Sequence, residues 1–141
     1  MAAAPADGVK AKSLEELQVY QRSLELAMAV TAILRRSGFE QDLRLRDQVR
    51  DASDSVVANI AEGFMQATDR AFARYLFIAR GSAGELHARI HLAHQRAYIT
   101  KEELRHTLDL VGHVLRMLTA LIKYLRHANR RDRGLGRHTE R

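Results

Sequence analysis

The 141-residue chain lacks residues and motifs on which whole classes of protein depend. It has no cysteine, which excludes disulfides, thiolate metal sites and cysteine nucleophiles. No apolar run approaches the ~20 residues that a membrane-spanning helix requires, and the start does not have the pattern of a signal peptide. There is no tryptophan, so stacking on nucleic-acid bases should contribute little to binding. We expect a cytoplasmic protein that does not associate with membranes.

Catalytic patterns are also missing. There is no glycine-rich phosphate loop and no nucleophile elbow. His87, His91 and His94 recur at helical spacing, but no carboxylate stands among them at ligand spacing, and neighbouring arginines would oppose a cation. Glu103 and His106 match half of a di-iron motif that needs two such halves. We expect no enzymatic activity, no cofactor and no metal.

Positive charge is the main compositional signal. The net charge is +6, and six arginines follow Leu125 against two acidic residues, so the tail carries four of the six net charges. A basic tail on a nearly balanced body favours contact with phosphate or an acidic surface, although a solubilising disordered end fits equally well. The candidate nucleic-acid-binding residues are Arg35, Arg36, Arg44, Arg46, Arg126, Arg130, Arg131, Arg133 and Arg137.

Apolar residues recur at spacings of three and four along four segments, about 14–36, 42–63, 69–98 and 101–127, which predicts four helices. Ser13 with Glu16 and Thr100 with Glu103 are expected to form capping boxes, Thr68 or Asp69 to cap the third helix, and Gly38 to end the first helix in the left-handed conformation. Short connections favour an all-α, antiparallel up-down-up-down bundle over 13–128. Residues 1–12 should be a flexible arm and 129–141 a disordered basic tail.

The last helix carries two adjacent apolar stripes rather than one. The first is Leu104, Leu108, Val111, Leu115, Leu118, Ile122 and Leu125, and the second is Leu110, Val114, Met117, Leu121 and Tyr124. Two stripes are wider than three neighbouring helices usually cover, and with Phe77 and Ile78 they predict a homo-oligomer. A deeply buried helix in a monomer is the alternative.

Polar and small residues gather between positions 59 and 86. Gly81 and Gly84 weaken a helix, so we expect backbone contact with a neighbouring helix to compensate. Asn59, Glu62, Ser82 and Glu85 are expected to fix register, with Arg74 or Arg80 as partner of a carboxylate. The predicted oligomer or register contacts are Asn59, Glu62, Phe77, Ile78, Gly81, Ser82, Glu85, Val114, Met117 and Leu121.

Three blocks of sequence also resemble a known family. They are residues 14–21 (LEELQVYQ), 59–63 (NIAEG) and 75–82 (YLFIARGS) with Glu85 and Leu86. In this order they resemble the bacterial four-helix bundle proteins encoded in intervening sequences of 23S ribosomal RNA genes, and their relatives, the accessory variability proteins of diversity-generating retroelements. The resemblance covers about residues 13–126. It implies a homopentamer without catalytic activity, and in the retroelement branch nucleic-acid binding and association with a reverse transcriptase.

Two functions are compatible with these features. The first is a non-enzymatic homo-oligomeric bundle that binds RNA or DNA nonspecifically through contacts between arginine and phosphate. The second is a protein-interaction scaffold or accessory subunit, for a partner such as a reverse transcriptase, that does not bind nucleic acid itself.

Overall fold

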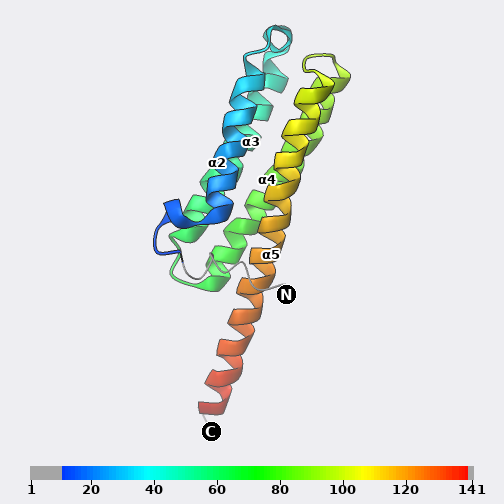
Figure 1. Cartoon of the computed structure of the whole chain (residues 1–141). Helices are drawn as coiled ribbons and strands as arrows, with labels where there is room; N and C mark the ends of the chain where they lie inside the picture. Colours follow the sequence, from blue (N-terminus) through cyan, green and yellow to red (C-terminus); the bar gives the residue numbers. More distant parts are fainter. Residues whose placement is uncertain (1–10, 140–141) are drawn as a thin grey trace.

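A computed structural model describes the backbone of residues 11–139 and the side chains of 11–36 and 38–128. In chain order the elements are the 3-10 turn η1 (Leu14–Glu16), α2 (Gln18–Leu34), the 3-10 turn η2 (Ser37–Gln41), α3 (Leu43–Phe64), α4 (Asp69–Gln95) and α5 (Lys101–Thr139). The four α-helices run antiparallel, and α2–α3, α3–α4, α4–α5 and α5–α2 are the packed neighbours (Figure 1). The predicted four-helix bundle is confirmed.

Two of the three predicted helix caps are confirmed, and a third helix start has a cap that was not predicted. Thr100 and Glu103 form the expected capping box, with the Glu103 N–H 3.1 Å from Thr100 Oγ1 and the Thr100 N–H 2.8 Å from Glu103 Oε1. Thr68 Oγ1 accepts from the Ala71 N–H at 3.1 Å. Asp42 Oδ1 accepts from the Leu45 N–H, also at 3.1 Å, and so caps α3.

The beginning and end of α2 differ from the prediction. Ser13 makes no side-chain cap, because residues 14–16 form a separate 3-10 turn closed by the Leu17 N–H on the Leu14 carbonyl. Leu17 is buried, and placing it in the core bends the chain just before α2. Gly38 is not left-handed either, since no described glycine has a positive φ. It lies in η2 against Tyr98, whose Cα would be 3.0 Å from an added Cβ.

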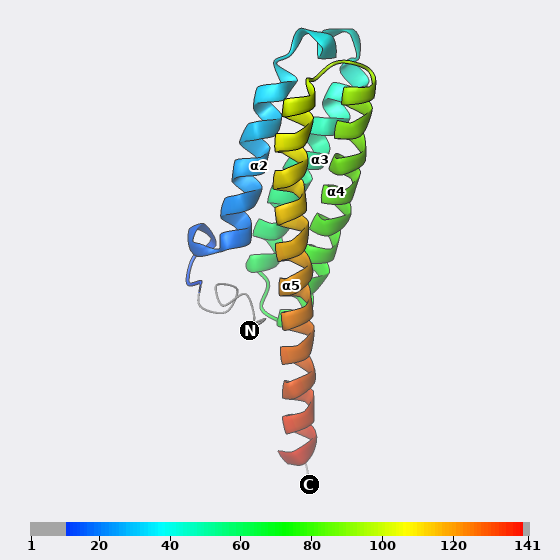
Figure 2. The ribbon, with the colours of Figure 1, turned by 45° about the vertical axis from the view of Figure 1, so that its right-hand side comes forward.

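The last two helices have different ends from those predicted. α4 stops at Gln95 rather than near 98, where the Tyr98 N–H bonds the Ala93 carbonyl and the Ala97 N–H bonds the His94 carbonyl. This is a Schellman motif, and Ala97 takes its left-handed position with φ 62°. α5 continues to Thr139 and projects past the other helices (Figure 2), so residues 129–139 of the predicted disordered tail are helical in the structure, and 140–141 lie outside the described residues. The predicted flexible arm lies mostly outside the described residues.

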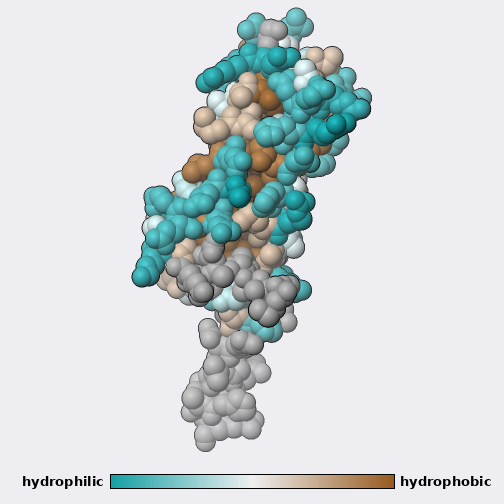
Figure 3. Space-filling model, viewed as in Figure 1, coloured by the Kyte–Doolittle hydropathy of each residue, from teal (hydrophilic) through white to brown (hydrophobic). Residues whose placement is uncertain are grey.

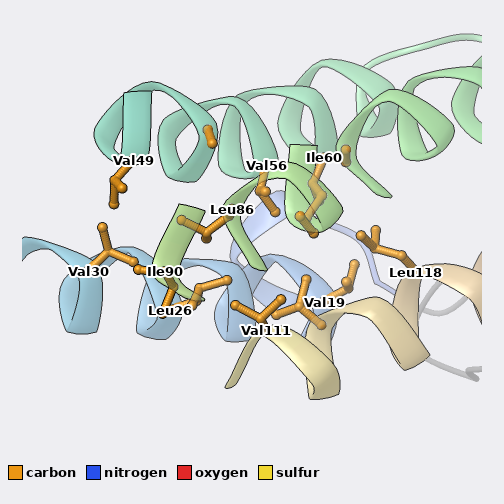
Figure 4. Packing of buried hydrophobic residues seen from close by; sticks show 14 of the residues in the cluster. Val19, Leu26, Val30, Val49, Val56, Ile60, Leu86, Ile90, Val111 and Leu118 are labelled. Carbon is orange, nitrogen blue, oxygen red and sulfur yellow. The ribbon is translucent and has the colours of Figure 1, made fainter. Parts of the chain in front are cut away.

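The core is mainly aliphatic, with Phe39 and Phe72 also buried, and it receives side chains from all four helices. Figure 4 shows Val19, Leu26 and Val30 of α2 facing residues of the other helices. The remaining labelled residues are Val49, Val56, Ile60, Leu86, Ile90, Val111 and Leu118. No helix of the described part is long and apolar enough to cross a membrane.

The second stripe of α5 is used within the chain. Val114 and Leu121 are each 1% exposed, and Met117 is half-buried against the same core. Because α5 packs on both α2 and α4, it needs an apolar face wide enough for two neighbours. Val114 and Leu121, predicted as oligomer or register contacts, are therefore core residues within one chain, and they do not support the prediction of an oligomer.

Candidate nucleic-acid interface

Four of the predicted phosphate-binding arginines lie at the end of the bundle where η2 joins α2 to α3. Arg35 and Arg44 are exposed there. Arg36 is partly engaged, with Nε 3.4 Å from Glu103 Oε1. Arg46 is half-buried, and its Nε has no hydrogen-bond partner among the described residues. The structure thus brings the four together at one end, but they do not form a uniformly free group of cations.

Asp42 joins three segments at this same end. We call this end the loop end, because η2 and the connection between α4 and α5 (96–100) both lie there. Its Oδ2 accepts from the Tyr98 hydroxyl at 2.9 Å and from Arg96 Nη1 at 3.0 Å, while Oδ1 caps α3. The hydrogen bond from the Leu45 N–H, followed by that from Tyr98, holds the pKa of Asp42 below its usual value. The same contact with Asp42 raises the pKa of Tyr98. The Tyr98 ring packs against Phe39, with centroids 5.4 Å apart.

A different arginine arrangement lies toward the opposite end, where α5 leaves the bundle. The guanidinium carbon of Arg80 is 4.7 Å from the centroid of the Phe77 ring, and that of Arg126 is 4.3 Å from it. Arg126 is exposed, and Arg80 and Phe77 are half-buried. No ion pair in the described part involves either arginine. Phe77, predicted as an oligomer or register contact, is the ring over which both cations lie.

Beyond Arg126 the structure describes only the backbone. The α5 helix continues, and Arg130, Arg133 and Arg137 follow Arg126 at spacings of four, three and four residues. This spacing places positions on one face of a helix. Arg131 lies on a neighbouring face. The side chains of these four arginines are outside the described residues.

Polar side chains link α3 to α4 along their length. Ser55 Oγ and Ser82 Oγ are 2.7 Å apart, and Asn59 Nδ2 donates to Ser55 Oγ at 3.0 Å. Gln48 lies seven residues before Ser55 on α3, and Arg89 lies seven residues after Ser82 on α4. There Arg89 Nη1 donates to Gln48 Oε1 at 2.8 Å. Asn59 and Ser82 thus lie between the two helices, and Ser55 connects them.

The predicted carboxylate partners differ from those in the structure. Glu85 pairs with Arg89 at 2.8 Å, one helical turn along α4, and not with Arg74 or Arg80. The spacing of Glu85 and Arg89 is a known stabilising one, and it could have been used to predict this pair. The Glu62 side chain is exposed, and no ion pair in the described part includes it.

The tight glycine of the α3–α4 pair is Gly63. A Cβ there would lie 2.9 Å from both Phe72 Cδ1 and Tyr75 Cβ. At Gly81 and Gly84 an added Cβ would meet nothing within 4 Å, so the expected backbone contact with a helix of the same chain is absent. Ile78, on the same exposed side of α4, is 48% exposed.

The three histidines of α4 do not form a metal site in this structure. The rings of His87 and His91 are 5.0 Å apart and tilted. Within the described part of the chain, no group of three or more histidine and acidic side chains is placed to hold a metal ion.

Comparison with known proteins agrees with the fold. The architecture is that of an antiparallel four-helix bundle. The chain belongs to the family of 23S rRNA-intervening sequence proteins, whose family model matches residues 15–120. A crystal structure of a protein of unknown function from the S23 ribosomal protein family of Bacteroides thetaiotaomicron is similar, with a TM-score of 0.68 and 23% sequence identity. The match covers 74% of this chain and 98% of that one. No curated protein matches the sequence.

Proposed function

We propose that this protein is a non-enzymatic helical bundle that binds RNA or DNA nonspecifically through contacts of arginine with phosphate. The observation that carries the proposal is the α5 helix, which continues beyond the bundle with arginine at positions 126, 130, 131, 133 and 137 (Figures 1 and 2). Only Asp132 and Glu140 oppose these charges after residue 125. A projecting basic helix can approach a polyanion without steric conflict with the rest of the bundle.

Phosphate contacts of this kind predict a clear salt dependence. Each neutralised phosphate releases condensed counterions, so the binding constant should fall steeply as salt rises and should vary little with base sequence. The loop end supports binding less well, because Arg36 and Arg96 are engaged with carboxylates there. We assign the main contact to α5 and only a minor one to Arg35 and Arg44.

The test is a titration of the full chain with fluorescently labelled RNA and DNA at low and moderate salt. A variant with Arg130, Arg131, Arg133 and Arg137 changed to Gln keeps the helix length, because Gln is a good helix former. It should bind more weakly and with a smaller salt slope, by about 0.7 per lost phosphate contact on a single strand. Absence of binding by the unmodified chain at low salt would refute the proposal.

We also propose that the protein assembles with copies of itself. Leu24 and Met28 on α2 are 41% and 67% exposed, and Ile78 and Leu92 on α4 are 48% and 40% exposed. Ile78 and Leu92 are fourteen residues apart, so they share one face of α4 with Gly81 and Ala88 between them. Figure 3 shows apolar surface between the hydrophilic side chains. The family resemblance implies a pentamer, and light scattering would test this prediction.

The same exposed residues favour the second candidate function, an accessory subunit for another protein such as a reverse transcriptase. Light scattering separates the two uses of this surface. Assembly that is lost in Leu24→Glu or Ile78→Glu variants would assign the surface to self-association, whereas a monomeric unmodified protein would favour a different partner.

A further inference from the structure

We propose that Arg80 and Arg126 together form a clamp for one phosphate group of a nucleic-acid strand, oriented by the Phe77 ring. This proposal rests on the proposed function and deepens it, because it assigns one specific phosphate site on the folded bundle. None of the arginines that the sequence pattern singled out, other than Arg126, belongs to this clamp. Arg80 was expected only as a structural partner of a carboxylate.

The geometry brings the two cations close together. Their guanidinium carbons lie 4.7 and 4.3 Å from the same ring centroid, so they are at most 9.0 Å apart. Like charges within this distance repel, and an anion bound by both would relieve the repulsion. A phosphate group has several acceptor oxygens and can receive hydrogen bonds from two guanidinium groups.

The Phe77 ring also restrains the hydrogen-bond donors of the two arginines. A cation–π contact restrains the position of a guanidinium, and its N–H groups can still reach an external acceptor. Phe77 packs against the core, so its ring is held in place and does not move together with the arginine side chains. Each guanidinium therefore needs less ordering when it binds than a free arginine would.

Among the described side chains, no carboxylate forms an ion pair with either cation. On α4, Glu85 is paired with Arg89 on the side that faces α3. Asp69 lies eight residues before Phe77, about 12 Å along the helix. On α5, Asp109 lies seventeen residues before Arg126, about 25 Å away, and Asp132 lies six residues after it, about 9 Å along the helix. Positive neighbours are closer, since Lys123 precedes Arg126 by one turn and is exposed.

The position of the clamp fits a continuous track for a strand. Arg126 lies on the side of α5 that faces α4, and positions 130, 133 and 137 continue its spacing along the projecting helix. A strand that follows this row would meet the clamp where α5 joins the bundle. The clamp would thus anchor a strand that the projecting helix otherwise binds only by charge.

The experiment measures binding of a fluorescein-labelled oligouridine to the full chain across a salt series. The variants are Arg80→Gln, Arg126→Gln and the double variant, with Arg50→Gln as the matched control. Arg50 is an exposed arginine of α3, which is not a packed neighbour of α5, and its replacement removes the same charge. Thermal melting checks that all variants remain folded.

If both arginines hold one phosphate, each single variant should bind about tenfold more weakly. Each should lower the salt slope by about 0.7, and the double variant should lower it no further. The double variant should also be at most about twofold weaker than either single one, since the shared contact is already lost. Arg50→Gln should change affinity less than about twofold.

Additive losses with two steps in salt slope would mean two separate phosphates and would overturn the clamp. Tight, salt-sensitive binding that neither variant weakens would overturn the clamp alone and leave the proposed function standing. No binding by the unmodified chain would overturn both.

Phe77→Leu tests the ring separately, because it keeps every charge. The salt slope should stay the same while affinity falls about threefold, as the guanidinium groups lose their orientation. Unchanged affinity in this variant would contradict the orienting role of Phe77.

Discussion

At the loop end of the bundle, Arg36 and Arg96 bind carboxylates of the same chain, at 3.4 Å from Glu103 and 3.0 Å from Asp42. Toward the opposite end, Arg80 and Arg126 lie over Phe77 with no carboxylate partner in the described structure. The two regions contain the same residue type in different surroundings. In the first, the guanidinium groups tie segments of the chain together, and in the second they form no ion pair with a described side chain.

This difference shows why net charge alone does not locate a binding surface. Exposed ion pairs contribute little free energy individually, but they occupy the donors that a phosphate would need. Asp42 adds to this at the loop end, because one carboxylate caps α3 and also accepts from Tyr98 and Arg96. The loop end should therefore respond to mutation mainly in stability, and the opposite end mainly in binding.

The largest stability effect is expected for Gly63→Ala, near the end where α3 meets α4. The added Cβ would lie 2.9 Å from Phe72 Cδ1 and Tyr75 Cβ, closer than real side chains approach. Overpacking of this kind costs about 1–3 kcal/mol, which lowers Tm by roughly 2–4 °C per kcal/mol in a chain of this size. Thermal unfolding followed by circular dichroism measures it.

Gly84→Ala is the matched control for Gly63→Ala. Nothing lies within 4 Å of an added Cβ at Gly84, so alanine should raise the free energy of unfolding by up to about 1 kcal/mol. If instead Gly84→Ala disrupts assembly, a second subunit approaches α4 at this glycine. Equal stability of the two variants would contradict the close contact at Gly63.

A smaller, pH-dependent effect is expected at Asp42. Its pKa is below the usual 3.8 in the folded protein, first because of the Leu45 N–H and then Tyr98. A carboxyl with a lowered folded pKa stabilises the protein above its unfolded pKa, and this contribution is lost as pH falls through the folded value. Asp42→Asn keeps a capping oxygen but has no such titration. Its Tm should be lower than that of the unmodified protein near neutral pH, and the two should converge in strong acid.

Parallel melting curves of the two proteins across acid pH measure this difference. A constant gap in Tm at every pH would mean that the charge of Asp42 does not contribute to stability. The Tyr98 hydroxyl would then be the more important part of the junction.

Much of the fold could be predicted because helix formation leaves a local pattern. The Thr100–Glu103 capping box is correct, as both members lie within one turn and no distant contact competes. The Ser13–Glu16 pattern looks the same in sequence but fails. There the burial of Leu17 in the core decides the backbone path, and this depends on residues far along the chain.

The candidate site was predicted less well, because its contacts join distant positions. Arg126 and Phe77 are forty-nine residues apart, and no periodicity links them. The two stripes of α5 were correctly seen but wrongly assigned, since Val114 and Leu121 are buried within the same chain. The apolar stripes of one helix show how much of its surface must be buried. Which helix buries that surface depends on how the helices pack against one another.

Thr107→Val should stabilise the loop-end half of α5 modestly. Thr107 is fully buried, and its Oγ1 has no hydrogen-bond partner in the described structure. A buried unpaired hydroxyl is unfavourable, and valine has the same shape without it. The free energy of unfolding should rise by about 1 kcal/mol. Denaturant unfolding measures the gain, and Thr107→Ser, which keeps the hydroxyl, should show none. A loss of stability with valine would indicate a hydrogen-bond partner for this hydroxyl.

The smallest effect is expected for Ala97→Gly, in the turn that brings Tyr98 to Asp42. Ala97 has φ 62°, a conformation that is unfavourable for any residue with a Cβ and common for glycine. Relief of this strain outweighs the greater freedom that glycine gives the unfolded chain, so stability should rise by about 0.5 kcal/mol. Ala88→Gly, in the exposed middle of α4, is the control and should lose about 1 kcal/mol. If both changes destabilise equally, the Schellman turn does not hold Ala97 in the left-handed region in solution, and the Tyr98–Asp42 contact is then less rigid than its 2.9 Å hydrogen bond suggests.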